Sequence, residues 1–163
     1  MVQTQANSQQ ITPFLWFDHQ AEEAARFYTS IFPNSKITSI HPKARVQGQP
    51  VQPTIVSFEL NGLALMGLNG GPHFSFSPAI SLFVSCDTQQ EVDELWDKLL
   101  EGGGQPERCG WLKDRYGLSW QIVPRILGEL MQSEEPERAA RVNEAMLKMI
   151  KLDVQTLKEA YEA

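Results

Sequence analysis

The chain has 163 residues, of which 42% are hydrophobic, and a formal net charge of −6 at pH 7. A chain of this size forms one ordinary globular domain or two small modules that share a core. The negative charge and the lack of a basic stripe argue against nucleic-acid binding, which concentrates Lys and Arg to release counterions. No apolar run reaches the roughly 20 residues that span a bilayer, so no membrane partner is expected.

The segment Met1–Gln10 is polar and has neither a basic region nor an apolar run. It is therefore predicted to be a flexible tail (residues 1–10) without a signal peptide. The two cysteines, Cys86 and Cys109, suit a reducing compartment and lack the spacing of a zinc site. We accordingly expect a cytoplasmic protein.

The first half of the chain, residues 11–69, predicts one helix among four strands. The elements are a strand at Ile11–Phe17, a helix at Ala21–Phe32, and strands at Lys36–His41, Thr54–Leu60 and Leu63–Asn69. Apolar residues of the helix recur at the spacing of one face, and Asp18 is placed to cap it. Asn61–Gly62 suits a two-residue type I′ turn, and the proline-rich stretch Pro42–Pro53 predicts a mobile loop.

After a linker at residues 70–78, the same order of elements begins again over residues 79–124. The elements are a strand at Ala79–Ser85, a helix at Thr88–Leu100, a strand at Gln105–Cys109 and a hairpin at Gly110–Pro124 that turns at Tyr116–Gly117. Thr88 and Glu91 form the pattern of a capping box. Gly102–Gly104 ends the helix. The sequence thus predicts an α+β fold of two βαβββ modules.

Residues 125–163 are predicted to form a helical tail. The expected helices are Ile126–Gln132, Glu137–Ile150 and Val154–Tyr161. Ala139, Val142, Met146 and Met149 make one apolar stripe, which is typical of a core or of a partner contact.

Alternation along the strands sorts their residues into two faces. The face expected under the helices is apolar and comprises Val56, Phe58, Leu60, Ala64, Met66, Leu68, Ile80, Leu82, Val84, Leu112, Trp120 and Ile122. The opposite face is mixed and comprises Pro13, Leu15, Phe17, Ser57, Glu59, Leu65, Gly67, Asn69, Ala79, Ser81, Phe83, Trp111, Lys113, Ser119 and Gln121. Aromatic walls with a few polar groups resemble the lining of a small-molecule pocket, although such a face is also typical of a half-exposed sheet.

Four features of the sequence resemble a known family. They are the repeated βαβββ order, the segment FLWFDHQAEEAARFYTSIFP, the turn LNGGPHF at Leu68–Phe74, and CGWLKDRYGLSWQIVP at Cys109–Pro124. Together they are similar to the PhnB-like, 3-demethylubiquinone methyltransferase-type branch of the vicinal oxygen chelate superfamily, which includes glyoxalase I and bleomycin-resistance proteins. The resemblance extends over about Ile11 to Tyr161 and implies a curved mixed sheet around a cup, and commonly a homodimer.

Metal-using members of the superfamily hold a divalent ion at four cup positions, and the resemblance places Pro13, Gly67, Ala79 and Gln121 there. Of these four, Gln121 alone has a side-chain donor atom, and a catalytic site needs about three protein ligands. The sequence therefore predicts no metal and no other cofactor. Gly102–Gly104 follows a helix and opens a strand, so it does not support a nucleotide-type loop for a methyl donor.

Six residues are predicted to contact a small-molecule ligand: Glu59, Asn69, His73, Trp111, Lys113 and Gln121. Trp111 offers a stacking surface, Asn69 and Gln121 offer amides, and His73 lies where it could reach the cup rim. Lys113 and Glu59 could pair across the cup to hold an anion or to move a proton. Five of the six also have a structural alternative: a solvated linker for His73, sheet-edge hydrogen bonds for the amides and an exposed ion pair for Lys113 and Glu59.

Three functions remain open at this point. The first is binding of an apolar or aromatic small molecule in the cup without the usual metal, with the reaction unknown. The second is a metal-independent isomerase or transferase that moves protons through Lys113, Glu59 or His73. The third is a protein-interaction module that works through the tail helices.

Overall fold

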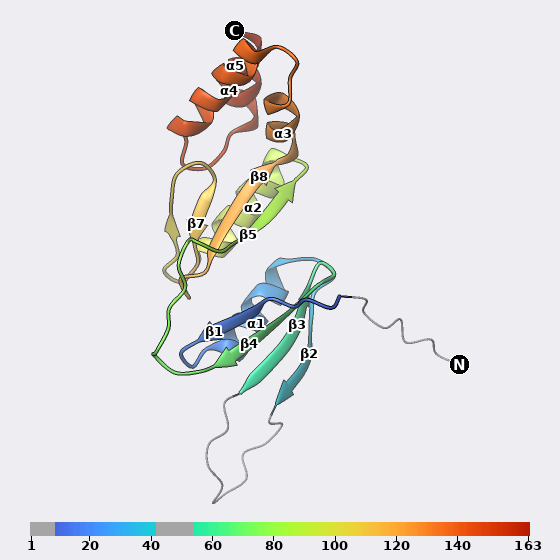
Figure 1. Cartoon of the computed structure of the whole chain (residues 1–163), viewed down its shortest axis with the longest axis vertical. Coiled ribbons are helices and arrows are strands. Elements are labelled where there is room, and N and C mark those ends of the chain that lie inside the picture. The colour runs from blue at the N-terminus through green and yellow to red at the C-terminus, as the bar shows by residue number, and fades with distance from the viewer. Residues whose placement is uncertain (1–8, 42–53) are drawn as a thin grey trace, which may run out of the picture. The chain divides into compact units, whose positions relative to one another are not determined.

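A computed structural model describes residues 9–41 and 54–163 of the chain (Figure 1). Contacts divide the chain into two compact units, Met1–Ser75 and Phe76–Ala163. Each unit contains one four-stranded mixed sheet. The expected loop at Pro42–Pro53 lies outside the described residues, as do residues 1–8 of the expected tail. The α+β class and the two βαβββ modules are confirmed.

The first unit contains one helix and four strands, as predicted. They are β1 (Phe14–Phe17), α1 (Ala21–Ile31), β2 (Lys36–His41), β3 (Ile55–Leu60) and β4 (Leu63–Asn69). The first sheet has the strand order β1-β4-β3-β2, in which β1 runs parallel to β4 and the other pairs are antiparallel. Helix α1 packs against β2, β3 and β4 (Figure 1).

The turn between β3 and β4 corrects the predicted faces of the first sheet. Asn61 and Gly62 both have positive φ, at 46° and 87°, as a type I′ turn requires. This two-residue turn pairs Leu60 with Leu63 and Phe58 with Leu65, and directly opposite residues share a face. Leu65 is buried with Phe58 under α1, so the expectation that Ala64, Met66 and Leu68 lie on the helix face is wrong.

The same correction extends to β1, which pairs with β4 in parallel. Leu15 is opposite Gly67 and Phe17 is opposite Asn69, and both Leu15 and Phe17 are buried. They face the helix, whereas the prediction placed them on the opposite side. The face of the first sheet that α1 does not cover therefore carries Phe14 and Trp16.

The start of α1 is held from β4 and not by Asp18. The cap residue is Gln20, whose side chain makes no capping hydrogen bond. The backbone N–H of Ala21 donates instead to Oδ1 of Asn69, at 2.7 Å. The carboxylate of Asp18 instead lies near the imidazole of His19, with 3.3 Å between Oδ2 of Asp18 and Nδ1 of His19. The prediction of an Asp18 cap is wrong because a residue 48 positions along the chain satisfies this helix end.

The second unit repeats the order and adds the tail. Its elements are β5 (Ser81–Cys86), α2 (Gln89–Leu100), β6 (Gln105–Pro106), β7 (Trp111–Lys113), β8 (Ser119–Pro124), α3 (Arg125–Met131), α4 (Pro136–Lys148) and α5 (Val154–Glu162). The second sheet has the order β5-β8-β7-β6, with β5 parallel to β8. Thr88 Oγ1 accepts from the N–H of Glu91 at 3.1 Å, which is one half of the predicted capping box, whereas Oε2 of Glu91 accepts from the N–H of Asp87 at 2.6 Å.

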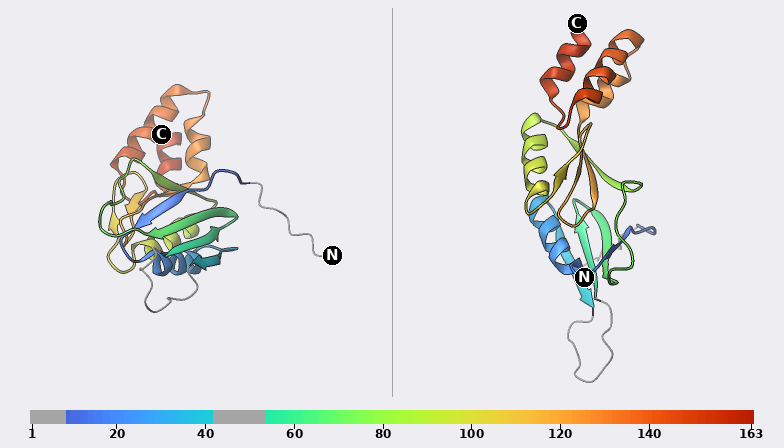
Figure 2. Two further views of the ribbon diagram at one scale, coloured as in Figure 1. Left: turned by 60° about the horizontal axis from the view of Figure 1, so that its bottom comes forward. Right: turned by 90° about the vertical axis from the view of Figure 1, so that its left-hand side faces the viewer.

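The predicted faces of the second sheet are correct for its paired strands. Leu112, Trp120 and Ile122 are buried, and α2 packs against β5, β7 and β8. Ile80 is an exception, because it precedes β5 and is 73% exposed. Figure 2 shows α2 along one side of this sheet.

The tail helices form a small core of their own beside β8. Leu127, Val142, Leu152 and Leu157 are buried together, with Met146 and Met149 packed against them. Three residues of the predicted apolar stripe, Val142, Met146 and Met149, therefore belong to this core. None of the helices in the described part of the chain has the length and apolar content that a membrane span requires.

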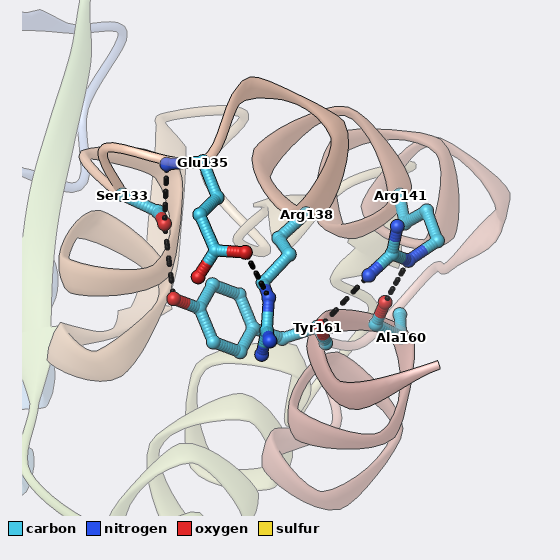
Figure 3. A network of polar contacts seen from close by, with 6 residues as sticks. All are labelled: Ser133, Glu135, Arg138, Arg141, Ala160 and Tyr161. Atoms are coloured by element: carbon cyan, nitrogen blue, oxygen red, sulfur yellow. Dashed lines mark hydrogen bonds and ion pairs between the residues drawn. The ribbon is translucent and has the colours of Figure 1, made fainter.

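Polar contacts hold α5 against the other tail helices (Figure 3). The hydroxyls of Tyr161 and Ser133 lie 2.9 Å apart, and the guanidinium of Arg138 lies over the Tyr161 ring, 5.0 Å from its centroid. Arg141 donates to the carbonyls of Ala160 and Tyr161 at 3.0 and 3.1 Å. The C-terminal turn of α5 is thus tied to α4 and to the segment that precedes it.

Candidate ligand-binding surface

A buried carboxylate shapes the hairpin that presents Trp111 and Lys113. Asp114 is 3% exposed, and its Oδ1 accepts from the N–H groups of Tyr116 and Leu118 at 2.8 and 3.0 Å. Its Oδ2 accepts from Nε1 of Trp120 at 2.8 Å. Charge-assisted bonds of this kind are strong, so one side chain fixes the loop between β7 and β8 and the indole at the start of β8.

Two cross-strand rows lie on the face of the second sheet opposite α2, which we call the open face. Trp111, Gln121 and Phe83 form one row across β7, β8 and β5. Lys113, Ser119 and Ser81 form the next. Side chains opposite each other in such rows have Cβ atoms about 5 Å apart. The predicted residues Trp111, Lys113 and Gln121 are therefore brought together.

The first row is an amide between two aromatic rings. Phe83 is 58% exposed, and Trp111 and Gln121 are half-buried. Nε2 of Gln121 donates to Oγ of Ser81 at 2.8 Å. That bond fixes the amide orientation and leaves its carbonyl oxygen directed away from Ser81.

The second row carries an ammonium and two hydroxyls. Nζ of Lys113 lies 3.1 Å from Oε1 of Glu107, with both side chains about one-third exposed. Ser119 is fully buried, and its hydroxyl has no hydrogen-bond partner among the described residues. The open face thus combines aromatic side chains with a hydroxyl, that of Ser119, which lacks a hydrogen-bond partner among the described residues.

The face of the first sheet that α1 does not cover is more apolar. It carries Phe14 and Trp16 from β1 and Met66 and Leu68 from β4. Nε1 of Trp16 donates to the carbonyl of Gly71 at 2.9 Å. The Phe74 ring packs edge to face against the indole, with 5.0 Å between the ring centroids. The predicted turn LNGGPHF therefore folds against this tryptophan.

Gly70 is required for that approach. A Cβ added at this position would lie 2.2 Å from Cζ2 of Trp16, far inside contact distance. The backbone of the turn consequently lies directly on the indole, as only glycine permits.

The remaining predicted contact residues belong to the first unit. Glu59 lies 3.6 Å from Nζ of Lys36 on the neighbouring strand. Asn69 holds the N-terminus of α1, and His73 is exposed in the turn after β4. Glu59 and Lys113 each have an ion-pair partner inside their own unit.

The positions that carry metal ligands elsewhere in the superfamily do not supply a ligand set. Gly67 faces α1, where an added Cβ would lie 3.5 Å from Ala21 Cβ, so its expected place on the cup face is wrong. Pro13 precedes β1, and Ala79 precedes β5. Within residues 9–41 and 54–163, no group of three or more His, Cys, Asp or Glu is placed to hold a metal ion. The residues present therefore do not fit a divalent centre.

Phe14 and Trp16 were not predicted as aromatic residues of the face that α1 does not cover. Ser81, Phe83 and Ser119 were placed on the mixed face but were not singled out for the site. The sequence did contain a signal for Phe14 and Trp16. A two-residue turn forces Leu60 and Leu63 onto one face, which fixes the faces of β4 and of its neighbour β1. No comparably clear sequence pattern indicated that Asp114 would be a buried hydrogen-bond acceptor. Its role depends on Trp120, six residues away on the next strand.

A shallow groove of about 380 Å³ lies between α4 and α5. Its walls include Ala145, Met149 and Ala160, with Arg141 and Lys148 at the sides. Arg141 is engaged with α5, and Lys148 pairs with Glu144 at 2.7 Å.

Comparison with known proteins places these features in a family. Residues 9–123 match the sequence model of the 3-demethylubiquinone-9 3-methyltransferase family. The PhnB protein of Bacillus cereus, whose name refers to the same activity, is 36% identical with a TM-score of 0.62 over 71% of this chain and 99% of its own. No curated protein sequence matches.

Two more distant structures share the fold alone. A Pseudomonas aeruginosa protein has 20% identity and a TM-score of 0.57 over 72% of this chain and 98% of its own. The fosfomycin resistance protein FosX of Mesorhizobium loti has 10% identity and a TM-score of 0.53 over 69% of this chain and 88% of its own. The family match extends over residues 9–123, so the expectation that the resemblance also includes the helical tail stays a prediction.

Proposed function

This chain belongs to the 3-demethylubiquinone-9 3-methyltransferase family, and we propose that it binds an apolar or aromatic small molecule on the open face of the second sheet, without a divalent metal. The observation that carries this proposal is the row Trp111–Gln121–Phe83, in which an oriented amide lies between two aromatic side chains. Binding sites commonly combine aromatic surface with a few fixed polar groups.

The chemistry of the row favours a flat ring. Trp111 and Phe83 offer edges and faces with which a ring stacks or packs edge to face. The Gln121 amide is held by Ser81, so its free carbonyl oxygen is already oriented when a ligand arrives. Pre-orientation of this kind lowers the entropy cost of binding.

Binding is tested with 2-naphthol as the probe, by titration calorimetry on the full chain. Trp111→Ala should weaken binding about tenfold, which corresponds to the loss of about 1.4 kcal/mol of aromatic contact. Leu147→Ala is the matched control, because this exposed apolar side chain lies on α4. Equal affinities for the Trp111 and Leu147 variants, or no binding by the parent protein, would refute the proposal.

Glu59, Asn69 and His73 stay predictions for ligand contact from the first unit. Of the three, His73 is the most exposed to a ligand, and Asn69 is the one whose side chain is tied to a helix. A loss of 2-naphthol affinity in His73→Ala, with an unchanged melting temperature, would support the prediction for that residue.

The family name favours a transferase as the second candidate function, and we propose that it would be metal-independent. Gly102–Gly104 lies between α2 and β6, where it ends a helix and does not open one, so it gives no support for a nucleotide-type donor loop. Lys113 beside Glu107 is the available proton-transfer pair on the open face. Turnover lost in Lys113→Met at a 2-naphthol concentration that saturates the variant would favour an enzyme over a binding protein.

Assembly and location complete the proposal. We propose a homodimer in the cytoplasm, on the family resemblance and on Cys86 and Cys109, which form no disulfide with each other. Sedimentation equilibrium tests the dimer, and a monomer at micromolar concentrations would contradict it.

A further inference from the structure

The row next to the proposed aromatic contact contains a polar group with nothing to bind. Ser119 is 0% exposed, and its Oγ has no hydrogen-bond partner among the described residues. Buried hydroxyls are nearly always satisfied, so an exception requires a reason. The position on the open face, between Lys113 and Ser81, points to a ligand atom as the missing partner.

The neighbours of Ser119 are also donors. Ser81 Oγ already accepts from Gln121, so its own hydrogen is free to be donated. Lys113 has three ammonium hydrogens, and Glu107 is the ion-pair partner of the group. The row therefore offers an ammonium and two hydroxyls to one electronegative atom.

We propose that the row Lys113–Ser119–Ser81 binds an oxygen substituent of the aromatic ligand, and that Ser119 is the residue that selects it. This inference rests on the proposed function, which supplies the ring contact with Trp111 and Phe83. The ligand class is then a flat ring that carries a hydroxyl, carbonyl or carboxylate oxygen. A plain hydrocarbon ring would leave the row unsatisfied and bind more weakly.

Because Ser119 is fully buried, a ligand atom reaches its hydroxyl only after a neighbouring side chain moves. Lys113 is its cross-strand neighbour, and the four-carbon stem of a lysine lets the ammonium swing aside while the charge stays close. The ligand oxygen then gives the Ser119 hydroxyl the hydrogen-bond partner that it lacks among the described residues. Ser119 thus selects a ligand that carries an oxygen, because a buried hydroxyl without a hydrogen-bond partner costs free energy.

The test compares 2-naphthol with naphthalene, two rings of one size that differ by one oxygen. The parent protein should bind 2-naphthol about threefold to tenfold more tightly, the worth of one net hydrogen bond. Ser119→Ala should bring the ratio of the two affinities close to one while naphthalene affinity is retained. Ser85→Ala, which removes a hydroxyl from an exposed position of β5 on the same face, is the matched control and should keep the ratio.

Folding gives a second readout. Because the Ser119 hydroxyl has no partner, Ser119→Ala should melt at or above the temperature of the parent protein. A clear fall in melting temperature, or an unchanged affinity ratio, would overturn the role of Ser119. Absence of binding for both compounds would instead refute the proposed function, so the two failures are distinguishable.

Discussion

At the scale of single residues, the side chain that most controls the second sheet is Asp114. Three donors converge on its two carboxylate oxygens. They come from the loop backbone and from the indole of Trp120, so the loss of this acceptor affects the hairpin and the core together.

We expect Asp114→Asn to destabilise the protein by about 2 kcal/mol, because an amide has one accepting oxygen where the carboxylate has two, so either the Trp120 indole or the two backbone N–H groups lose their acceptor. Asp87→Asn is the control. Asp87 forms an exposed pair with Arg125, and such pairs contribute less than about 1 kcal/mol. Urea denaturation measures both variants, and equal losses would contradict the assigned role of Asp114.

The two cysteines provide a matched comparison of thiol reactivity. Cys86 is 1% exposed, and burial, aided by the nearby Glu91 and Asp87 carboxylates, raises the pKa of its thiol from 9.0 to about 11. Cys109 is half-buried and free. Since the thiolate is the reactive form, a thiol reagent at about pH 8 should label one cysteine in the native protein, and Cys109→Ala should abolish that labelling.

The raised pKa of Cys86 also predicts a pH dependence of stability. The unfolded chain releases this proton near pH 9, whereas the folded chain keeps it until about pH 11. The stabilisation is thus fully present below pH 9.0 and is lost as the pH rises to about 11, a loss of about 3 kcal/mol. Cys86→Ala should show a correspondingly smaller decline over this interval, measured by urea denaturation, and a parallel decline would contradict it.

At the scale of elements, the tail is fastened to the second sheet by backbone contacts. Cys109 N–H donates to the carbonyl of Met149 at 2.9 Å, and Gly110 N–H donates to that of Ile150 at 2.8 Å. Gln89 of α2 donates to the carbonyl of Leu152 at 3.1 Å and accepts from the N–H of Val154 at 2.8 Å. The tail lies outside the family match, yet it is an integral layer of this unit.

We expect Gln89→Ala to destabilise the protein by about 1–2 kcal/mol, because it removes both hydrogen bonds to the tail. Gln90→Ala is the control, since this neighbouring amide is exposed and bonds to Glu94 within the same helix. Hydrogen exchange should also show faster exchange at Val154 in the Gln89 variant. Similar stability of the two variants would mean that the tail does not depend on this contact.

At the scale of the whole molecule, the composition of the two sheets predicts how the protein responds to metal ions. The face of the first sheet that α1 does not cover presents Phe14, Trp16, Met66 and Leu68. The open face of the second sheet presents Gln121 and Ser81. The carboxylates on these faces, Glu59 and Glu107, lie in different units and are each paired with a lysine. Within residues 9–41 and 54–163 no group of three His, Cys, Asp or Glu is placed to hold a divalent cation.

Nickel, zinc or manganese should therefore leave the melting temperature of the metal-free protein unchanged. A specific site would raise the free energy of unfolding by RT ln(1 + [L]/Kd). A concentration-dependent rise of that form, reversed by a chelator, would show that the protein has a metal site after all.

Much of the architecture follows from local pattern. The repeat of strand, helix and three strands, the Thr88 cap and the Asn61–Gly62 turn could all be predicted, because each depends on residues close together in the chain. The three candidate residues of the second sheet were also placed on one face correctly, since Leu112 and Trp120 alternate with more polar neighbours.

Local pattern failed in β1 and β4 for a definite reason. The segments FLWF and LALMGLN are apolar on both sets of alternating positions, so the period of two separates the sets without showing which one is buried. Pairing with β3 decides the matter, and pairing depends on partners distant in sequence. The faces of these two strands were consequently inverted.

The sequence by itself determined two βαβββ modules and a helical tail, and it leaves Gln121 as the one side-chain donor among the four expected metal positions. Only the tertiary structure decided that Asn69 holds α1, that Asp114 holds Trp120, and that Ser119 is buried without a partner. The physical reason is distance along the chain. Alternation and capping are local properties, whereas each of these three depends on which strands become neighbours when the sheet forms.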